Sequence, residues 1–461
     1  MTSAVFEPAN ISGITLQNRL IRSATHESMA DEHGAPTEAL EKLYVKLAKG
    51  GAGAIITGYA GVQQDGKSSL SNMLMIDSDE LIPAHRKLTE KVHEYGVPVI
   101  LQIAHCGRQT RSAVTGQPTV APSARKDFIF NEETPHELDE REIETIIDNF
   151  VAATARAKRA GFDGVQLHLA HGYLLAQFLS NHTNRRNDQW GGSTANKFTI
   201  VSEIMRRIRK TLGSYPVLAK INAYDSRPGG MRTEEAVEIA RLLESSGCDA
   251  IEVSSGVVEE GLTIMRGPNP PVEALFTSSF RFSTIPALLK PVAAPFIQFA
   301  MRSPKPLRSY NLDAAISIKQ AVSIPVITVG GIHTLEDISA ALENGSMDYV
   351  SMSRPFIIEP DIVRKFREGQ QTRSRCIMCN YCALMIEVDA VRCYYGKLPE
   401  PPYPDRHAQG LGRAQHQRAA GTGAQAQGKR STSWRRIRAA SRQCTGAKLP
   451  LGADRRTGET G

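Results

Sequence analysis

Eight short runs of β-branched and aliphatic residues, separated by segments with helical spacing, constrain the fold of this chain more than any other feature. Such alternation is typical of βα units that build a parallel sheet. Several of the helical segments end in glycine, as expected at a helix C-cap before the next strand. Eight units in about 350 residues predict an α/β fold of the (β/α)8 TIM barrel type, with a doubly wound open sheet as the alternative. The runs are 20–23, 53–57, 97–102, 164–168, 217–221, 250–253, 326–329 and 349–352.

Changes in composition divide the chain into three regions. We expect the barrel in residues 1–370, a short cysteine-rich extension in 371–400 and a disordered basic tail in 401–461. The tail lacks the periodic apolar pattern that a core needs, and it resembles a shifted reading frame or a non-native extension. The proline-rich connection between Ser255 and Asn311 is longer than an ordinary loop, and its leucines and phenylalanines predict a folded lid.

The net charge of +7 does not indicate a nucleic-acid partner. Twelve lysines and arginines against three acidic residues lie after Pro404, so the first 404 residues carry a net charge of −2. A basic surface for nucleic acid would therefore rest on the tail alone. No run approaches the roughly 18–20 apolar residues of a membrane helix, and the start of the chain lacks a signal-peptide pattern. We expect a cytoplasmic protein without a membrane or nucleic-acid partner.

The most informative motif follows the fourth run, where His168, His171 and Tyr173 lie within six residues. In a TIM barrel this is the carboxyl end of a strand, where active sites form. Two imidazoles can bind a substrate carbonyl oxygen and stabilise the charge that develops on it, and a phenol can deliver a proton to carbon. A zinc pair and packed structural histidines are the alternatives, although no third ligand lies in this segment.

The segments Gly161–Ser180 and Asn184–Ser193 closely resemble the Old Yellow Enzyme family of FMN-dependent reductases, and the resemblance runs from about Phe6 to Phe366. It implies a barrel that binds FMN and receives electrons from NAD(P)H. A histidine at position 26 resembles the 2,4-dienoyl-CoA reductase and enoate reductase branch, and a covalent cysteinyl-flavin is not expected there. The resemblance places cofactor contacts after the first and second runs, at Ser23, Ala24, Thr25, His26 and Gly58.

The resemblance implies further cofactor contacts at the other strand ends. Gln102 resembles the amide that pairs with the flavin pyrimidine edge, because an amide both donates and accepts. Lys220 resembles the cation near flavin N1 and O2 that stabilises the reduced flavin, with an ordinary ion pair in the barrel lumen as the alternative. Backbone amides and a guanidinium after the last two runs are predicted to bind the FMN phosphate. They belong to Gly330, Gly331, Ser353 and Arg354.

Four closely spaced cysteines follow the barrel, at Cys376, Cys379, Cys382 and Cys393. Their spacing resembles the 4Fe–4S ligand run of the dienoyl-CoA reductase and trimethylamine dehydrogenase branches. A zinc site with four cysteine ligands and the absence of any metal are the alternatives. Members with such a cluster normally carry a C-terminal nucleotide-binding domain, and Gly410–Gly412 is not followed by the strand–helix pattern of that domain.

These residues predict an NAD(P)H-dependent flavin oxidoreductase that reduces an activated C=C bond of an enone or enoate. On this interpretation His168 and His171 bind the carbonyl oxygen, Tyr173 protonates carbon, and the partner is a small unsaturated carbonyl compound. A homo-oligomer or a separate electron-donor subunit is a further expectation. The alternatives are a flavoprotein that oxidises amines or C–H bonds, and an electron-relay subunit, each passing electrons to an iron–sulfur cluster.

Overall fold

A computed structural model describes residues 3–127, 133–268 and 271–397. The chain divides into a compact unit, Met1–Pro404, and a second unit, Asp405–Gly461. The second unit and the predicted tail lie outside the described residues. The domain boundaries expected at residues 370 and 400 stay predictions.

Within the described residues, eight parallel strands close into a barrel, and the TIM barrel prediction is confirmed. Closure comes from β10, which pairs with β7 on one side and with β11 on the other. Nearly every residue of these strands is buried, as expected for a parallel sheet that is covered on both faces. The strands are β3 (Leu20–Arg22), β4 (Ala54–Ile56), β7 (Val99–Ala104), β10 (Gly164–Leu169), β11 (Val217–Asn222), β12 (Ala250–Ser254), β13 (Val326–Val329) and β14 (Tyr349–Met352).

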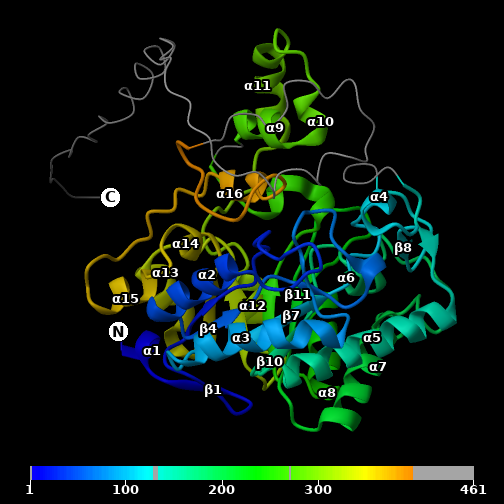
Figure 1. Ribbon diagram of the computed structural model, residues 1–461, viewed down its shortest axis with the longest axis horizontal. Helices are drawn as coiled ribbons and strands as arrows, with labels where there is room; N and C mark the ends of the chain where they lie inside the picture. Colours follow the sequence, from blue (N-terminus) through cyan, green and yellow to red (C-terminus); the bar gives the residue numbers. More distant parts are fainter. Residues whose placement is uncertain (1–2, 128–132, 269–270, 398–461) are drawn as a thin grey trace, which may run out of the picture. The chain divides into compact units, whose positions relative to one another are not determined.

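Helices cross over between successive strands and cover the outside of the barrel (Figure 1). Capping side chains fix where they begin: Asp139 and Glu142 form a capping box at the start of the longest one, and Thr37 accepts from the Leu40 amide at the start of the first. The crossover helices are α2 (Glu38–Lys49), α3 (Ile82–His93), α5 (Glu140–Arg159), α7 (Thr194–Leu212), α8 (Thr233–Ser245), α12 (Leu312–Lys319) and α13 (Leu335–Leu342), and α14 (Arg354–Ile358) and α15 (Ile362–Arg367) follow the last strand.

The inward-facing residues of the strands form layers along the barrel, because every second side chain of a strand points to the same face. The lowest layer is apolar and packs against a hairpin of β1 (Ala9–Ile11) and β2 (Ile14–Leu16), which closes the amino-terminal end. Two residues further along the same strands, the side chains are polar: Gln102 follows Ile100, Lys220 follows Leu218 and Glu252 follows Ala250. The polar layer therefore lies toward the carboxyl ends of the strands.

Shorter helices, strands and turns lie outside the eight barrel strands and their helices. They are α1 (Ser3–Phe6), β5 (Ala60–Gly61), β6 (Leu74–Met75), α4 (Ser112–Thr115), β8 (Val120–Ala121), β9 (His136–Glu137), α6 (Leu174–Leu179) and the 3-10 turns η1 (Gln64–Gly66), η2 (Asp79–Leu81), η3 (Val258–Ile264) and η4 (Glu343–Gly345). Among the described residues, no helix combines the length and the apolar character that a bilayer span requires.

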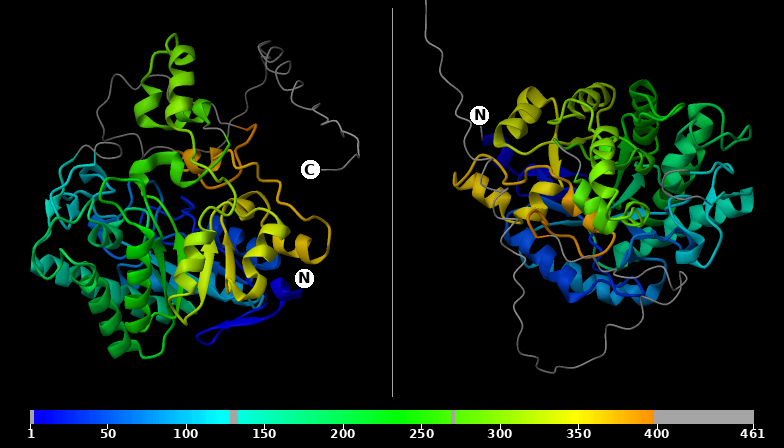
Figure 2. Two further views of the ribbon diagram at one scale, coloured as in Figure 1. Left: turned by 180° about the vertical axis from the view of Figure 1, so that it is seen from behind. Right: turned by 90° about the horizontal axis from the view of Figure 1, so that it is seen from above.

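The long connection after β12 is helical, in agreement with the predicted lid. It contains α9 (Val272–Ser278), α10 (Phe280–Ser283) and α11 (Lys290–Ala300), which stand together beyond the barrel (Figure 1). The cysteine-rich extension with α16 (Tyr381–Met385) lies beside them (Figure 2). Leu275 of α9 and Leu384 of α16 share one small apolar cluster. The cysteine-rich extension and the lid therefore pack against each other at one end of the barrel.

Candidate active site

The carboxyl end of β10 brings His168, His171 and Tyr173 together, as the sequence predicts. The His168 ring centroid lies 5.0 Å from that of His171 and 4.9 Å from that of Tyr173, and both pairs meet edge to face. His171 has a left-handed backbone conformation with φ of 62°, and Gly172 follows at 80°. This sharp turn folds the chain back, so that three residues close in sequence place their rings in one cluster.

Hydrogen bonds fix the orientation of both imidazoles. The Ala170 amide donates to His168 Nδ1 (3.3 Å), which leaves Nε2 as the protonated nitrogen of a neutral ring. His171 Nε2 shares a hydrogen bond with Ser254 Oγ (2.8 Å), and the His171 amide donates to Asn222 Oδ1 (3.1 Å). Burial, with Lys220 nearby, lowers the pKa of His171 to about 3 and that of His168 well below its usual value. Both rings are therefore neutral at physiological pH.

Tyr59, which the sequence analysis did not single out, completes the ring cluster. The Tyr173 hydroxyl donates to Tyr59 Oη (3.2 Å), and Tyr59 Oη is 3.1 Å from Ser68 Oγ. The predicted cofactor residue His26 stacks on the Tyr59 ring at 5.0 Å. Burial raises the pKa of Tyr173 well above its usual value, so the phenol stays protonated. No spacing rule connects Tyr59 with residue 173, because the two lie on different strand ends.

On the strands next to β10, in register with His168, Lys220 and Glu252 form a buried ion pair, with Lys220 Nζ 3.2 Å from Glu252 Oε2. Lys220 also donates to Ser23 Oγ (2.9 Å), and Ser23 and Ser351 each donate to Glu252 Oε1. Burial alone would raise the pKa of Glu252, but Lys220 and the neighbouring donors outweigh it and lower that pKa. The sequence analysis missed Glu252, although a carboxylate inside an aliphatic run was a usable signal.

The other residues predicted near the flavin ring lie around this pair. Gln102 Nε2 donates to Gln166 Oε1 (2.7 Å), and Gln166 donates in turn to Glu252. The Gly58 amide donates to Glu27 Oε1 (3.1 Å), so Gly58 is held by a carboxylate of the first loop. Ala24 packs partly buried on the lumen core. The structure thus gathers these positions at one end of the barrel, although they come from three strand ends.

On the opposite side of the mouth, Gly330, Gly331, Ser353 and Arg354 follow β13 and β14. In the described part of the chain the backbone amides of Gly330, Gly331 and Arg354 donate no hydrogen bond. Thr25 Oγ1 is 2.7 Å from Ser353 Oγ, which joins the first loop to this side. Arg354 is only 9% exposed, yet no described carboxylate lies within 4.0 Å of it. A buried guanidinium that has no counterion in the described part of the chain, beside open amides, is a donor set that suits a phosphate.

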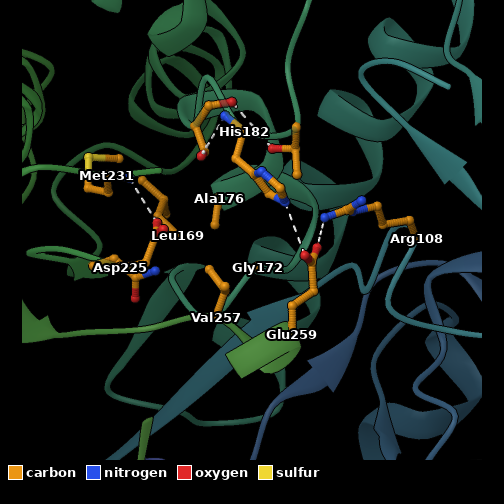
Figure 3. Close-up of a pocket in the computed structure, with 12 residues that line it drawn as sticks. Arg108, Leu169, Gly172, Ala176, His182, Asp225, Met231, Val257 and Glu259 are labelled. Carbon is orange, nitrogen blue, oxygen red and sulfur yellow. Dashed lines mark hydrogen bonds and ion pairs between the residues drawn. The ribbon is translucent and has the colours of Figure 1, made fainter. Parts of the chain in front are cut away.

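A small pocket beside His171 is closed by a cluster of charges (Figure 3). Glu259 of η3 is ion-paired with Arg108 and lies 3.0 Å from His182 Nε2 and 3.3 Å from Arg227 Nε. The start of the same segment is held as well, since the Val258 amide donates to the His171 carbonyl (3.0 Å). These contacts attach the first turn of the lid to the barrel next to the ring cluster.

The four cysteines of the extension are unpaired and partly buried. Within the described residues, no three histidine, cysteine, aspartate or glutamate side chains converge closely enough to hold a metal ion. The predicted 4Fe–4S cluster therefore stays a prediction, and we derive no step through it.

The fold and the polar mouth define the class: a (β/α)8-barrel enzyme with its site at the carboxyl ends of the strands. The chain belongs to the NADH:flavin oxidoreductase / NADH oxidase family, whose model matches residues 4–268 and 294–373. The resemblance to the Old Yellow Enzyme family is confirmed by a solved Old Yellow Enzyme homologue from Zymomonas mobilis. That structure superposes with a TM-score of 0.63 and 25% identity, over 81% of this chain and 95% of the homologue.

Two curated relatives illustrate the range of the family. A NADH oxidase of Thermoanaerobacter brockii is 35% identical over 82% of this chain and 52% of the relative. A 4,4'-dithiodibutanoate disulfide reductase of Rhodococcus erythropolis is 30% identical over 83% of this chain and 92% of the relative. The chain thus spans about half the length of the first relative and nearly all of the second.

Proposed function

We propose that this protein is an FMN-dependent reductase that takes electrons from NAD(P)H and reduces an activated C=C bond of an enone or enoate. The observation that carries the proposal is the convergence of His168, His171 and Tyr173 next to the buried Lys220–Glu252 pair, on strands where His168 is in register with Lys220. Membership in a family of NADH:flavin oxidoreductases supports it. Within this proposal, the assignment to the dienoyl-CoA and enoate reductase branch rests only on the histidine at position 26.

The residues present fit FMN at both ends of the cofactor. Arg354 and the open amides of Gly330 and Gly331 would hold the phosphate. Lys220 and Gln102 would face the flavin ring, with Ser23, Ala24, Thr25, His26 and Gly58 along it. When bound, FMN supplies the hydride that is added to the β-carbon of the substrate.

The two histidines bind the substrate oxygen in this proposal. His168 donates from its protonated Nε2, and His171 donates from Nε2, the nitrogen that contacts Ser254 Oγ. Because both rings are neutral, they polarise the carbonyl without giving up a proton to it. One such donor contributes about 3–4 kcal/mol of transition-state stabilisation when it is well placed.

Tyr173 supplies the proton to the α-carbon. Its raised pKa keeps the phenol protonated until a carbanion-like carbon, a stronger base than the surrounding groups, develops beside it. Tyr59 holds the Tyr173 hydroxyl by the hydrogen bond between the two phenols. Neither the amine-oxidising nor the electron-relay alternative is favoured by a contact among the described residues, and we do not propose them. A homo-oligomer and a separate electron-donor subunit stay predictions.

Purified protein should bind FMN, and under anaerobic conditions it should oxidise NADH or NADPH only when an enone is added. The flavin is measured by its absorption spectrum, and the reaction by loss of nicotinamide absorbance together with the saturated product. Protein that neither contains nor takes up FMN would overturn the proposal. Turnover of nicotinamide that no enone or enoate stimulates would remove the substrate class and leave the flavin site standing.

A further inference from the structure

Arg354 lies where three distant segments meet, and its contacts are directed at two of them. Its Nη1 donates to the Asn380 side-chain oxygen (2.6 Å) and to the Arg266 carbonyl (2.9 Å), with the Met265 carbonyl at 3.4 Å. The first acceptor belongs to the cysteine-rich extension and the other two to the lid. Among the described residues no acceptor contacts Nε or Nη2, so these donors remain for a phosphate.

Asn380 links the cysteine-rich extension to the lid and to Arg354 by hydrogen bonds. Its side chain is buried, its amide nitrogen donates to the Met265 carbonyl, and its oxygen accepts from Arg354. The backbone is left-handed at Asn380 (φ 62°) and at Met378 (φ 58°), a conformation that asparagine tolerates well. Asn380 directly follows Cys379, so any rearrangement of the cysteines first displaces Asn380 and its hydrogen bonds.

The close fit of the loop against the lid leaves little room for independent movement. A Cβ atom built on Gly267 would come within 2.2 Å of the Met378 carbonyl oxygen, so the two backbones are in direct contact. Further along, Ser28 Oγ donates to the Ile386 carbonyl (3.0 Å) and the Val391 amide donates to the Glu27 carbonyl (2.8 Å). The extension therefore touches both the first loop and the phosphate side of the mouth.

We propose that Asn380 is a positioning residue that couples the conformation of the cysteine loop, residues 376–382, to the affinity for the flavin phosphate. With Nη1 anchored by Asn380, the guanidinium is held in one orientation before the cofactor arrives. When the loop is displaced, Arg354 loses this anchor and must be ordered by the phosphate itself, which weakens binding. The inference rests on the proposed FMN site, and it gives the extension a role that does not depend on a metal.

The test compares FMN with riboflavin, which lacks the phosphate, by flavin fluorescence titration of the full-length chain. In N380A the affinity for FMN should fall about tenfold, as expected for one hydrogen bond to a charged group, while the affinity for riboflavin should stay unchanged. N18A is the matched control, because Asn18 is an equally buried asparagine at the amino-terminal end of β3 that bonds Gly51 and Leu20. N380S serves if N380A does not fold.

The coupling itself is tested by combining N380A with C379A, which perturbs the loop. C379A should weaken FMN binding in the wild-type background and add nothing in the N380A background, because coupled residues are non-additive. Additive losses, an equal loss of FMN and riboflavin, or an N380A variant with wild-type FMN affinity would each overturn the coupling and leave the proposed function intact. A wild-type chain that binds no FMN would instead overturn the proposed function.

Discussion

The two sides of the barrel mouth are built in opposite ways. On the β10 side, the three proposed reacting side chains come from the six residues between His168 and Tyr173. On the β13–β14 side, the donors come from two strand ends, and Arg354 is oriented by the lid and by Asn380. One side is set by a local turn and the other by the packing of segments far apart in the sequence.

The two sides of the mouth should therefore respond to different kinds of substitution. A turn with a left-handed His171 followed by Gly172 depends on few residues, so its chemistry can be removed without loosening the cofactor. Arg354 is held by two segments that are remote in the sequence, so substitutions far from the cofactor should change its orientation.

The largest effect is expected on the β10 side, from Tyr173→Phe. Loss of the proton donor should slow the oxidative half-reaction by about 10²- to 10⁴-fold, and reduction of the flavin by NAD(P)H should be unchanged. Stopped-flow measurement of the two half-reactions separates them. Tyr215→Phe is the control, since that buried phenol bonds the Phe162 carbonyl away from the mouth. Equal losses in both half-reactions would remove Tyr173 from its role.

A smaller effect is expected on the β13–β14 side, from Arg354→Met. Loss of the guanidinium should weaken FMN binding by about 100-fold, the equivalent of about 3 kcal/mol for charged hydrogen bonds. Tyr173→Phe should leave FMN affinity unchanged, which keeps the two sides distinct. Arg209→Met is the control, because Arg209 also donates to backbone carbonyls but lies at the other end of the barrel. Wild-type FMN affinity in Arg354→Met would place the phosphate elsewhere.

The smallest effect is expected on the pH dependence of stability, from one buried histidine on each side of the barrel mouth. Burial, with Arg354 nearby, lowers the pKa of His333 to about 3, and burial lowers that of His168 well below its usual value. The unfolded chain therefore binds more protons than the folded chain below pH of about 6.5, and stability falls as the pH falls from there toward 3. Each residue contributes up to about 1.4 kcal/mol per pH unit.

Urea unfolding between pH 7 and pH 5 measures this slope. His168→Gln and His333→Gln should each flatten it, and His33→Gln should not, because the His33 side chain is exposed. A slope that either substitution leaves unchanged would mean that the corresponding histidine is not held neutral by the fold.

How much the sequence predicts depends on the range of the interaction. The eight runs predict the barrel because strand and helix periodicity are local properties, and the His168–Tyr173 segment predicts the ring cluster because a strand end and a turn are local too. Glu252 could have been predicted from the sequence, since a carboxylate in a strand of a buried sheet needs a partner. Tyr59 and Asn380 could not have been predicted, because their partners Tyr173 and Arg354 lie 114 and 26 residues away.

The periodicity of the sequence was enough to predict the eight strands in order and the position of His168, His171 and Tyr173 at the end of one of them, because both follow from local backbone structure. Long-range packing was needed to see that Lys220 is paired with Glu252, that Arg354 lies buried with no carboxylate of the described residues beside it, and that Asn380 of the cysteine-rich loop accepts from it. Burial and charge pairing depend on which segments meet in space, and closure of the barrel sets those meetings.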